Sequence, residues 1–273
     1  MTTPLPQLPP AGRPAARSPW DVQRGVLFAL LLREMKARVG GQWVGAVWTL
    51  MEPLMHTLVT LTIYAGIRGR VMPGAEFPVF LATGLLPFFL FQHIATRLMD
   101  GIDANRGLFA YRQVTPFDTL VSRTAVEAIM NMLVYIVTLG LLGWLGYHVW
   151  PVAPLEMIGV QLLMILLGFG YGMFAAVVSH ERPRLRSFIR ISMMPLYFAS
   201  GILFPIHYAP PDLLHWLLYN PLLHLIELSR HAFMPDYWTP AGINLRYPVM
   251  FSLTLCALAL LSYRADRWRL VTT

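Results

Sequence analysis

Long apolar stretches alternate with short polar loops along this chain of 273 residues. Six stretches are long enough to cross the hydrocarbon core of a bilayer as a helix, which takes about 20 residues, although the last is only just sufficient. They run over Val44–Ile67, Val79–Met99, Phe117–Tyr147, Met157–Val178, Phe188–Phe204 and Tyr247–Tyr263. The pattern predicts an all-α integral membrane protein with six transmembrane helices.

The basic residues between these stretches rise and fall in number from one loop to the next. If the segments cross in turn, 17 of the 21 lysines and arginines lie on one side, and the other side carries only Arg68, Arg70, Arg230 and Arg246. Cytoplasmic loops of membrane proteins are enriched in Lys and Arg. The predicted topology therefore places both ends in the cytoplasm, N-in/C-in.

The region before the first span divides into two parts. Residues 1–20 are rich in proline and arginine, a composition typical of disorder. Asp21–Arg38 predicts a helix that lies at the cytoplasmic interface of the membrane. Residues 21–270 then form one transmembrane domain, because six spans and short loops leave no room for a separate soluble domain.

One cytoplasmic loop ends in a helix-start signal. The loop Asp100–Thr115 is the longest internal one on this side, and it is followed by Pro116 and, two residues later, Asp118. Threonine at the N-cap, proline at N1 and a carboxylate at N3 resemble a capping box. The third span is therefore expected to begin at a defined residue on the cytoplasmic surface.

The extracytoplasmic region Pro205–Arg246 contains two apolar stretches that are too short to cross, Asp212–Tyr219 and Leu222–Phe233. Both are too apolar for a solvated loop, so we expect re-entrant helices in the outer leaflet before the last span. Glu227 and Arg230 can pair at i, i+3. The apolar faces of the two helices are expected to bury Leu213, Leu214, Trp216, Leu217, Leu222, Leu225 and Ile226.

Polar residues recur every fourth position in the first and third spans, which places each set on one helix face. The two sets are Trp48, Glu52, His56, Thr60 and Tyr64, and Arg123, Glu127, Asn131 and Tyr135. They either line a polar path or form a buried seam in which Arg123 pairs with Glu127 inside one helix. Glycines at 140, 143 and 146 and at 168, 170 and 172 are typical of close helix packing.

Several classes of chemistry are excluded by composition. The net charge of +7 belongs to cytoplasmic loops, so nucleic-acid binding is not expected. A phosphate-binding loop needs a lysine after glycine, and the only lysine, Lys36, follows Met35, so the chain has no ATPase site of its own. His224, Glu227 and His231 share a helix face, but no fourth ligand is near, so no metal site is predicted.

Several motifs, in order along nearly the whole chain, resemble one family. The segments are Leu32-Arg33-Glu34, Glu52-Pro53, Phe77-Pro78-Val79-Phe80-Leu81, Gly84-Leu85-Leu86-Pro87-Phe88-Phe89, Asn105-Arg106-Gly107-Leu108-Phe109 with Tyr111-Arg112, Asn220-Pro221-Leu222, and Glu227-Leu228-Ser229-Arg230 before Met234-Pro235. In these segments the chain is similar to capsular-polysaccharide export permeases, the KpsM-like type-2 ABC transporters.

The resemblance implies a multi-pass permease subunit of the bacterial inner membrane. It would be half of an ATP-driven exporter that moves lipid-linked acidic capsular polysaccharide out of the cytoplasm, with no enzymatic activity of its own. Two copies would form a homodimer and pair with two copies of a cytoplasmic ABC ATPase, which binds ATP and magnesium. A periplasmic co-polymerase and an outer-membrane export protein would continue the path.

Two other classes stay open beside this interpretation. A membrane-embedded glycosyltransferase or acyltransferase of polysaccharide assembly would need a carboxylate or histidine pair at the membrane rim, for which His224 and Glu227 are the one candidate. A structural membrane scaffold would need none of the ionisable residues inside the spans.

Two sets of residues are predicted to carry the function. The substrate-binding set is basic and aromatic, and it is expected to meet the negatively charged lipid-linked end near the cytoplasmic headgroups; it comprises Arg33, Lys36, Arg38, Trp43, Trp48, Glu52 and His56. The ATPase-coupling set lies in Asp100–Thr115, with apolar anchors expected to be exposed; it comprises Arg106, Leu108, Phe109, Tyr111 and Arg112. The basic loop His180–Arg186 is a second, weaker coupling candidate.

Overall fold

The computed structural model of the chain describes residues 18–39, 51, 54–60, 62–63, 76–111, 113–180, 182–234 and 236–272. Every regular element in these residues is helical, so the predicted all-α class is confirmed. The elements are α1 (Pro19–Val39), α3 (Phe77–Met99), η1 (Asp103–Ala110), α4 (Pro116–Trp144), α5 (Pro154–Ser179), α6 (Pro183–Ala199), η2 (Ile206–Tyr208), α7 (Pro211–Leu217), α8 (Pro221–Phe233), α9 (Arg246–Asp266) and α10 (Arg269–Thr272).

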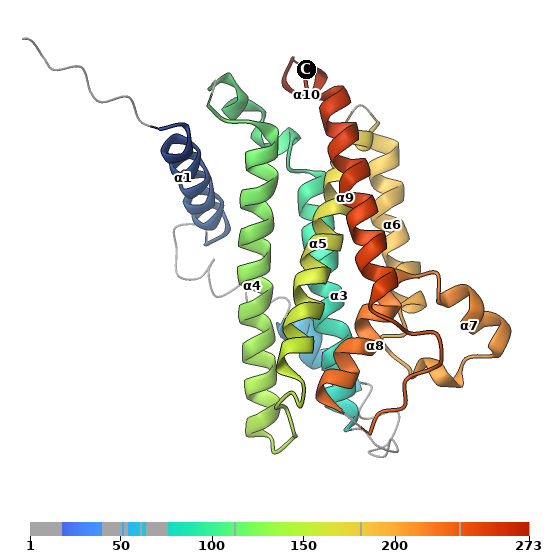
Figure 1. The fold of residues 1–273 in the computed structure, drawn as a ribbon. Helices are drawn as coiled ribbons and strands as arrows, with labels where there is room; N and C mark the ends of the chain where they lie inside the picture. The colour runs from blue at the N-terminus through green and yellow to red at the C-terminus, as the bar shows by residue number, and fades with distance from the viewer. Residues whose placement is uncertain are drawn as a thin grey trace, which may run out of the picture.

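The long helices α3, α4, α5, α6 and α9 stand side by side in one bundle (Figure 1). Within the described residues, α3, α4, α5 and α9 are long and apolar enough to cross a membrane. Helix α6 has 17 residues, and most of the predicted first span falls outside the described residues. The six-span count therefore stays a prediction, whereas the polytopic class does not depend on it.

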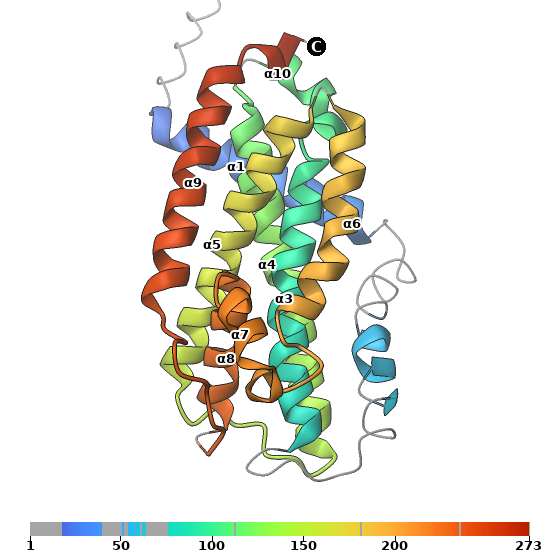
Figure 2. The ribbon, with the colours of Figure 1, turned by 90° about the vertical axis from the view of Figure 1, so that its right-hand side faces the viewer.

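Helix α3 is the centre of the bundle and packs against α4, α5, α6 and α8 (Figure 2). Its most apolar window is 83% buried, although every side chain of an isolated membrane span would face lipid. Phe80, Phe88, Phe91 and Leu98 are all fully enclosed there. A span that is surrounded by protein on all sides can position polar groups away from lipid, which the site described below requires.

Glycines bring α5 into close contact with its neighbours. A β-carbon on Gly172 would lie 2.7 Å from Cβ of Leu98 in α3, and one on Gly170 would lie 2.8 Å from Sγ of Cys256 in α9. The packing role predicted for these glycines is therefore confirmed. Gly140 of α4 differs, because its β-carbon would meet no described atom within 4 Å.

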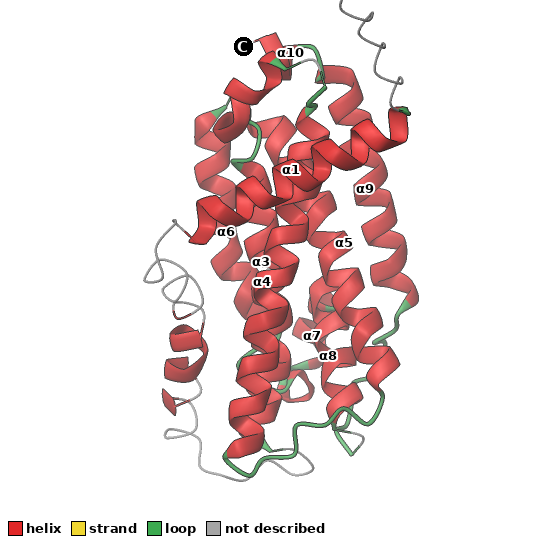
Figure 3. Cartoon of the chain, turned by 90° about the vertical axis from the view of Figure 1, so that its left-hand side faces the viewer, coloured by secondary structure: helices red, strands yellow, loops and turns green. Residues whose placement is uncertain are grey.

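Helix α1 crosses the bundle obliquely against α4, at the end where α10 lies (Figure 3). The start of α1 and the end of α10 thus share one end of the molecule, as the N-in/C-in topology requires, and the crossing direction suits a helix in the plane of the interface. At the same end Thr115 caps α4: Oγ1 of Thr115 accepts from the Asp118 N–H, and the Asp118 carboxylate accepts from the Thr115 N–H at 2.9 Å. The predicted capping box is confirmed.

The two predicted short helices before the last span both exist, as α7 and α8, but only α8 is buried. Leu222, Leu225 and Ile226 of α8 are enclosed between α3, α5 and α9. In α7 no residue is buried against the rest of the protein, and Leu213 and Trp216 are exposed, so its insertion into the outer leaflet stays a prediction. Helix α7 protrudes from the side of the bundle (Figure 1), where no other described helix covers it.

Candidate functional site

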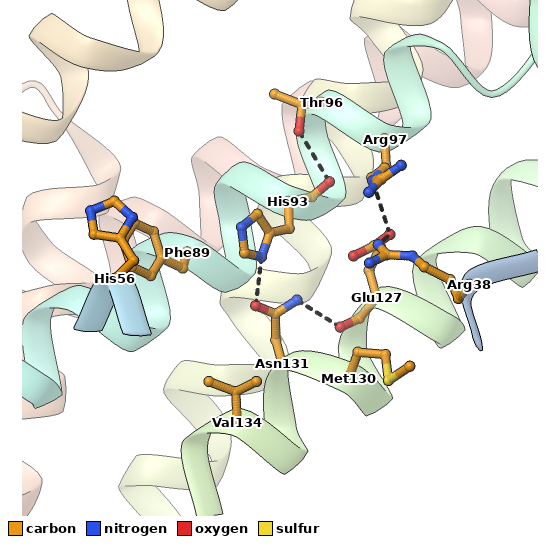
Figure 4. A pocket seen from close by; sticks show the side chains of 10 residues that line it. All are labelled: Arg38, His56, Phe89, His93, Thr96, Arg97, Glu127, Met130, Asn131 and Val134. Carbon is orange, nitrogen blue, oxygen red and sulfur yellow. Dashed lines mark hydrogen bonds and ion pairs between the residues drawn. The ribbon is translucent and has the colours of Figure 1, made fainter. Parts of the chain in front are cut away.

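A polar cavity of about 260 Å³ lies between α1, the helical residues 54–60, α3 and α4 (Figure 4). It is lined by helices rather than by loops, and it lies on the side of α3 and α4 that faces α1. Its lining consists of Arg38, His56, Phe89, His93, Thr96, Arg97, Glu127, Met130, Asn131 and Val134.

Glu127 is the only carboxylate in this lining and is almost completely buried. It pairs with Arg38, which α1 supplies, and with Arg97 of α3, whose Nε lies 3.6 Å from Oε1. A buried carboxylate of this kind is stable only when a partner compensates its charge. Among the described residues of the lining, two guanidinium groups accompany one carboxylate, which is an excess of positive charge.

Asn131 of α4 connects α4 to α3 next to the ion pairs of Glu127. It lies one turn after Glu127 on the same face of α4, and its Nδ2 donates to the Glu127 carbonyl at 2.8 Å. Its Oδ1 lies 2.8 Å from Nδ1 of His93 in α3. Because an amide oxygen can only accept, His93 donates from Nδ1, which leaves Nε2 as an acceptor unless the ring is protonated.

Three rings form one side of the cavity. The centroids of His56 and Phe89 are 4.9 Å apart, and those of Phe89 and His93 are 5.8 Å apart with the planes inclined by 15°. An aromatic face beside imidazole, amide and guanidinium groups can pack against the apolar side of a sugar ring and hydrogen-bond its hydroxyl or carboxylate groups. The arrangement suits an acidic carbohydrate.

The predicted pairing of Arg123 with Glu127 inside α4 is wrong. Nε of Arg123 instead lies 3.2 Å from Glu34 of α1, and Glu127 pairs with Arg38 of α1. Helix α1 crosses α4 and offers an acid and a base four residues apart, in the order that complements α4. Each charge therefore finds its partner on the other helix, and α1 is clamped to α4 at two points.

The structure brings together part of the predicted substrate-binding set. Arg38 and His56 line the cavity. Arg33 does not: its Nη1 donates to Asn105 at 3.0 Å and ties α1 to η1 instead. Lys36 is exposed, and Trp43, Trp48 and Glu52 lie outside the described residues.

His93, Thr96 and Arg97 were missed by sequence reasoning, although they line the cavity. The available signal was their position, because they are polar residues near the C-terminal end of an apolar span, α3. His93 and Arg97 are four residues apart and share a helix face, but this stripe has only two polar members and is shorter than those of the first and third spans.

The predicted coupling loop folds as the 3₁₀ helix η1 with one side in the core. Phe109 is buried and Leu108 is partly buried, so the expectation that both are exposed anchors is wrong, because this short helix turns its apolar side inward. Tyr111 is exposed as expected. Arg106 pairs with Asp103 at 3.2 Å, and Arg112 lies outside the described residues.

The two predicted coupling elements are joined by ion pairs. Nη2 of Arg186 donates to Asp103 at 2.5 Å, and Nδ1 of His180 lies 3.0 Å from the same carboxylate. Burial alone would raise the pKa of Asp103, but the hydrogen bond and charge of Arg186, with the charges of His180 and Arg106, lower it below the usual value. Asp103 is therefore ionised at cytoplasmic pH.

The predicted pair Glu227–Arg230 is confirmed in α8, where Nη1 of Arg230 donates to Glu227 at 2.6 Å and both side chains are fully buried. The guanidinium also lies over the Phe80 ring, 3.7 Å from its centroid. His224 is occupied too: Nε2 lies 2.9 Å from the Leu218 carbonyl, and Nδ1 accepts from the Asn244 N–H. His224 and Glu227 thus serve structural contacts and form no open catalytic pair.

No three His, Cys, Asp or Glu side chains among the described residues are arranged to hold a metal ion.

These features define the class of protein: a helical membrane protein with a polar cavity at the side of its bundle and an ion-paired surface formed by α6 and the start of η1. Residues 25–234 match the ABC-2 type transporter family, and the chain belongs to that family.

Its relatives place it among the KpsM-like permeases. The chain is 39% identical to the polysialic acid transport protein KpsM of Escherichia coli, over 94% of this chain and all of that protein. It is 29% identical to the capsule polysaccharide export inner-membrane protein CtrC of Neisseria meningitidis serogroup A, over 88% of each chain. It is 25% identical to BexB of Haemophilus influenzae, which has the same description, over 79% of this chain and 81% of that protein. The predicted family and the inner-membrane location are confirmed.

Proposed function

We propose that the chain is the permease of an ATP-driven exporter that carries lipid-linked acidic capsular polysaccharide from the cytoplasm across the inner membrane. The observation that carries this proposal is the 39% identity to a polysialic acid transporter over the whole length of that protein. The cavity supports an acidic glycan, because it combines an excess of positive charge with an aromatic face and several hydrogen-bonding groups.

We propose that the energy comes from a separate polypeptide. The sequence has no lysine in a phosphate-binding loop, so ATP and magnesium would bind to a cytoplasmic ABC ATPase present in two copies. Two copies of this permease would form a homodimer through residues 21–270, with residues 1–20 outside the transmembrane domain. A periplasmic co-polymerase and an outer-membrane export protein would receive the glycan.

The ATPase would dock on η1 and on exposed Arg182 and Arg184 of the adjoining loop His180–Arg186, in which Arg186 is held by Asp103. Exposed Tyr111 is the best-supported anchor, and Arg106 and Arg112 would act with it, whereas partly buried Leu108 and buried Phe109 would shape η1 from within. Replacing Tyr111 with alanine therefore tests docking without opening the core, which a change at Phe109 would do.

In the substrate path, Arg38 and His56 would act with His93 and Asn131 on the charged part of the glycan. Arg38 is also paired with Glu127. A carboxylate of the passing glycan would therefore compete with Glu127 for the Arg38 guanidinium and would not meet an unpaired charge. Such competition favours weak binding, which suits a polymer that has to move on. Arg33, Lys36, Trp43, Trp48 and Glu52 would extend the site toward the headgroups.

The test is reconstitution of the permease with its ATPase in vesicles that contain the lipid-linked acidic glycan. We expect ATP-dependent movement of glycan across the bilayer, and a strongly reduced rate with Asn131→Ala, which removes a hydrogen-bond partner of His93, but not with Asp266→Asn, which removes an exposed ion pair away from the cavity. Glycosyl or acyl transfer by the permease alone would favour the transferase alternative. Absence of ATP-dependent movement in the wild-type complex would contradict the proposal.

A further inference from the structure

Helix α6 is connected at both ends by polar contacts and is only loosely packed between them. Among its described side chains, Met193 alone is buried. Phe188, Ile191, Met194 and Phe198 are exposed along one face. Such a helix can shift along its neighbours without opening a cavity in the core, unlike the enclosed helix α3.

At the cytoplasmic end, α6 is joined to the start of η1 and to the turn before it. Arg186 contacts two carboxylates there: Nη2 lies 2.5 Å from Asp103, the first residue of η1, and Nη1 lies 3.8 Å from Asp100, which caps α3. One turn later, Arg190 pairs with Asp100 as well. Two arginines on one helix face thus hold these two carboxylates, and a displacement of η1 pulls on α6 directly.

At the outer end, α6 is joined to α8. Nδ2 of Asn220 donates to Oγ of Ser200 at 2.9 Å and to the Ala199 carbonyl at 3.3 Å, while Oδ1 of the same residue caps α8 by accepting from the Leu222 N–H. The Asn220 side chain therefore contacts the end of α6 and also caps the start of α8.

A second contact strengthens this outer connection. The chain turns directly after α6 at Gly201, whose φ of +66° is unfavourable for residues with a side chain. In this turn the carbonyls of Gly201 and Ile202 accept from Nη2 of Arg230 in α8, at 2.8 and 2.9 Å. Because the Arg230 side chain is fully buried, water cannot replace it as the hydrogen-bond donor to these two carbonyls.

We propose that α6 transmits displacement of η1 to α8, with Arg186 and Arg190 as the cytoplasmic contact and Asn220 and Arg230 as the outer one. The inference rests on the proposed function, since the ATPase has to move η1. Seventeen helical residues span about 25 Å, most of the thickness of the hydrocarbon core. A helix of this length resists compression along its axis because each turn is hydrogen-bonded to the next; Pro195 interrupts this near the outer end.

The experiment measures whether nucleotide changes the outer surface. A single cysteine is introduced as Leu213→Cys, at an exposed position of α7 next to α8, in a protein that also carries Cys256→Ala. The intact permease–ATPase complex is labelled from outside with a membrane-impermeant maleimide, with and without ATP. In this background we expect ATP to change the labelling rate at least about fivefold, the lower end of typical coupling between sites.

Two variants break the connection at opposite ends. Arg186→Gln removes the charge that holds Asp103, and Asn220→Asp keeps the helix cap but loses the amide donor to Ser200 and Ala199. Both should abolish the nucleotide-dependent change in labelling and reduce export at least about fivefold, while the ATPase still co-purifies and hydrolyses ATP. Arg186→Lys retains the charge and should retain much of the change in labelling.

The matched control is Asp266→Asn, which removes an exposed ion pair on the same cytoplasmic end that does not involve α6. It should behave as the parent protein. Unchanged labelling and export in Arg186→Gln would overturn the proposal, and so would loss of ATPase binding in that variant, because the contact would then be a docking contact. Wild-type export without any nucleotide-dependent labelling at position 213 would also overturn it. If instead the proposed function itself is wrong, the wild-type complex would not export glycan at all, so the two failures can be told apart.

Discussion

At the scale of single residues, the buried carboxylate of Glu127 holds three helices together. Breaking a fully buried ion pair costs about 3–5 kcal/mol, but Arg97 is more than half exposed and water replaces part of its contact. We expect Glu127→Gln to lower the free energy of unfolding by about 1–3 kcal/mol. Thermal unfolding in detergent checks this, with Asp266→Asn as an exposed control, and equal melting temperatures of the two variants would contradict it.

The pair Glu227–Arg230 differs because both partners are fully enclosed. Arg230→Met alone leaves a buried carboxylate without its partner and should destabilise the protein by about 3–5 kcal/mol. Adding Glu227→Leu should recover part of that loss, though not all, since the carbonyls of Gly201 and Ile202 stay without their donor. A double-mutant cycle on melting temperature measures this, and strictly additive losses would show that the two side chains are not coupled.

Sequence spacing predicted one of these pairs and not the other. Glu227 and Arg230 share a helix three residues apart, so local geometry sufficed. Glu127 has an equally suitable local partner in Arg123, yet it pairs with Arg38, 89 residues away. The choice is made by the crossing of α1 over α4, which no spacing within α4 contains. The complementary order of Glu34 and Arg38 was the one available signal.

At the scale of the elements, close contact between α3 and α5 depends on the missing side chain of Gly172. We expect Gly172→Ala to destabilise the protein, because the new methyl group would lie 2.7 Å from Leu98 and 3.0 Å from the Ala95 carbonyl. Gly140→Ala is the matched change in α4, where nothing described lies within 4 Å, and it should be neutral or stabilising by up to about 1 kcal/mol. A lower melting temperature for Gly140→Ala than for Gly172→Ala would contradict this.

The helices themselves were largely predictable because bilayer thickness constrains their length. Four of the six predicted spans correspond closely to α3, α4, α5 and α9, and Thr115 and Asn220 mark where α4 and α8 begin. Burial of the short helices was less predictable. Helices α7 and α8 are both apolar, but only α8 lies between other helices, and that depends on how the chain turns at Gly201 and Asn220.

At the scale of the whole molecule, the exposed surfaces differ in how well they suit lipid. The most apolar window of α9 is only 22% buried and is composed mainly of apolar side chains, as expected for a helix that faces lipid. Helix α6 is also poorly covered but is the least apolar helix of the bundle and carries Arg184, Arg186 and Arg190. Because arginines are costly in lipid, we expect α6 to lie against a second copy of the chain, which its exposed apolar face of Phe188, Ile191, Met194 and Phe198 would contact.

The last prediction follows from this difference. In a Cys256→Ala protein, Met194→Cys in α6 should form a disulfide between two copies, whereas Leu261→Cys in α9 should not, although the two side chains are 68% and 64% exposed. Ile136→Cys in α4, 61% exposed, tests whether the third predicted span also lies at the dimer contact. Cross-linked dimers are measured by non-reducing electrophoresis of membranes and by the mass of the purified complex. A complex that contains one permease copy and exports glycan would contradict the homodimer. Cross-linking through α9 but not through α6 would contradict the prediction that the two copies meet along α6.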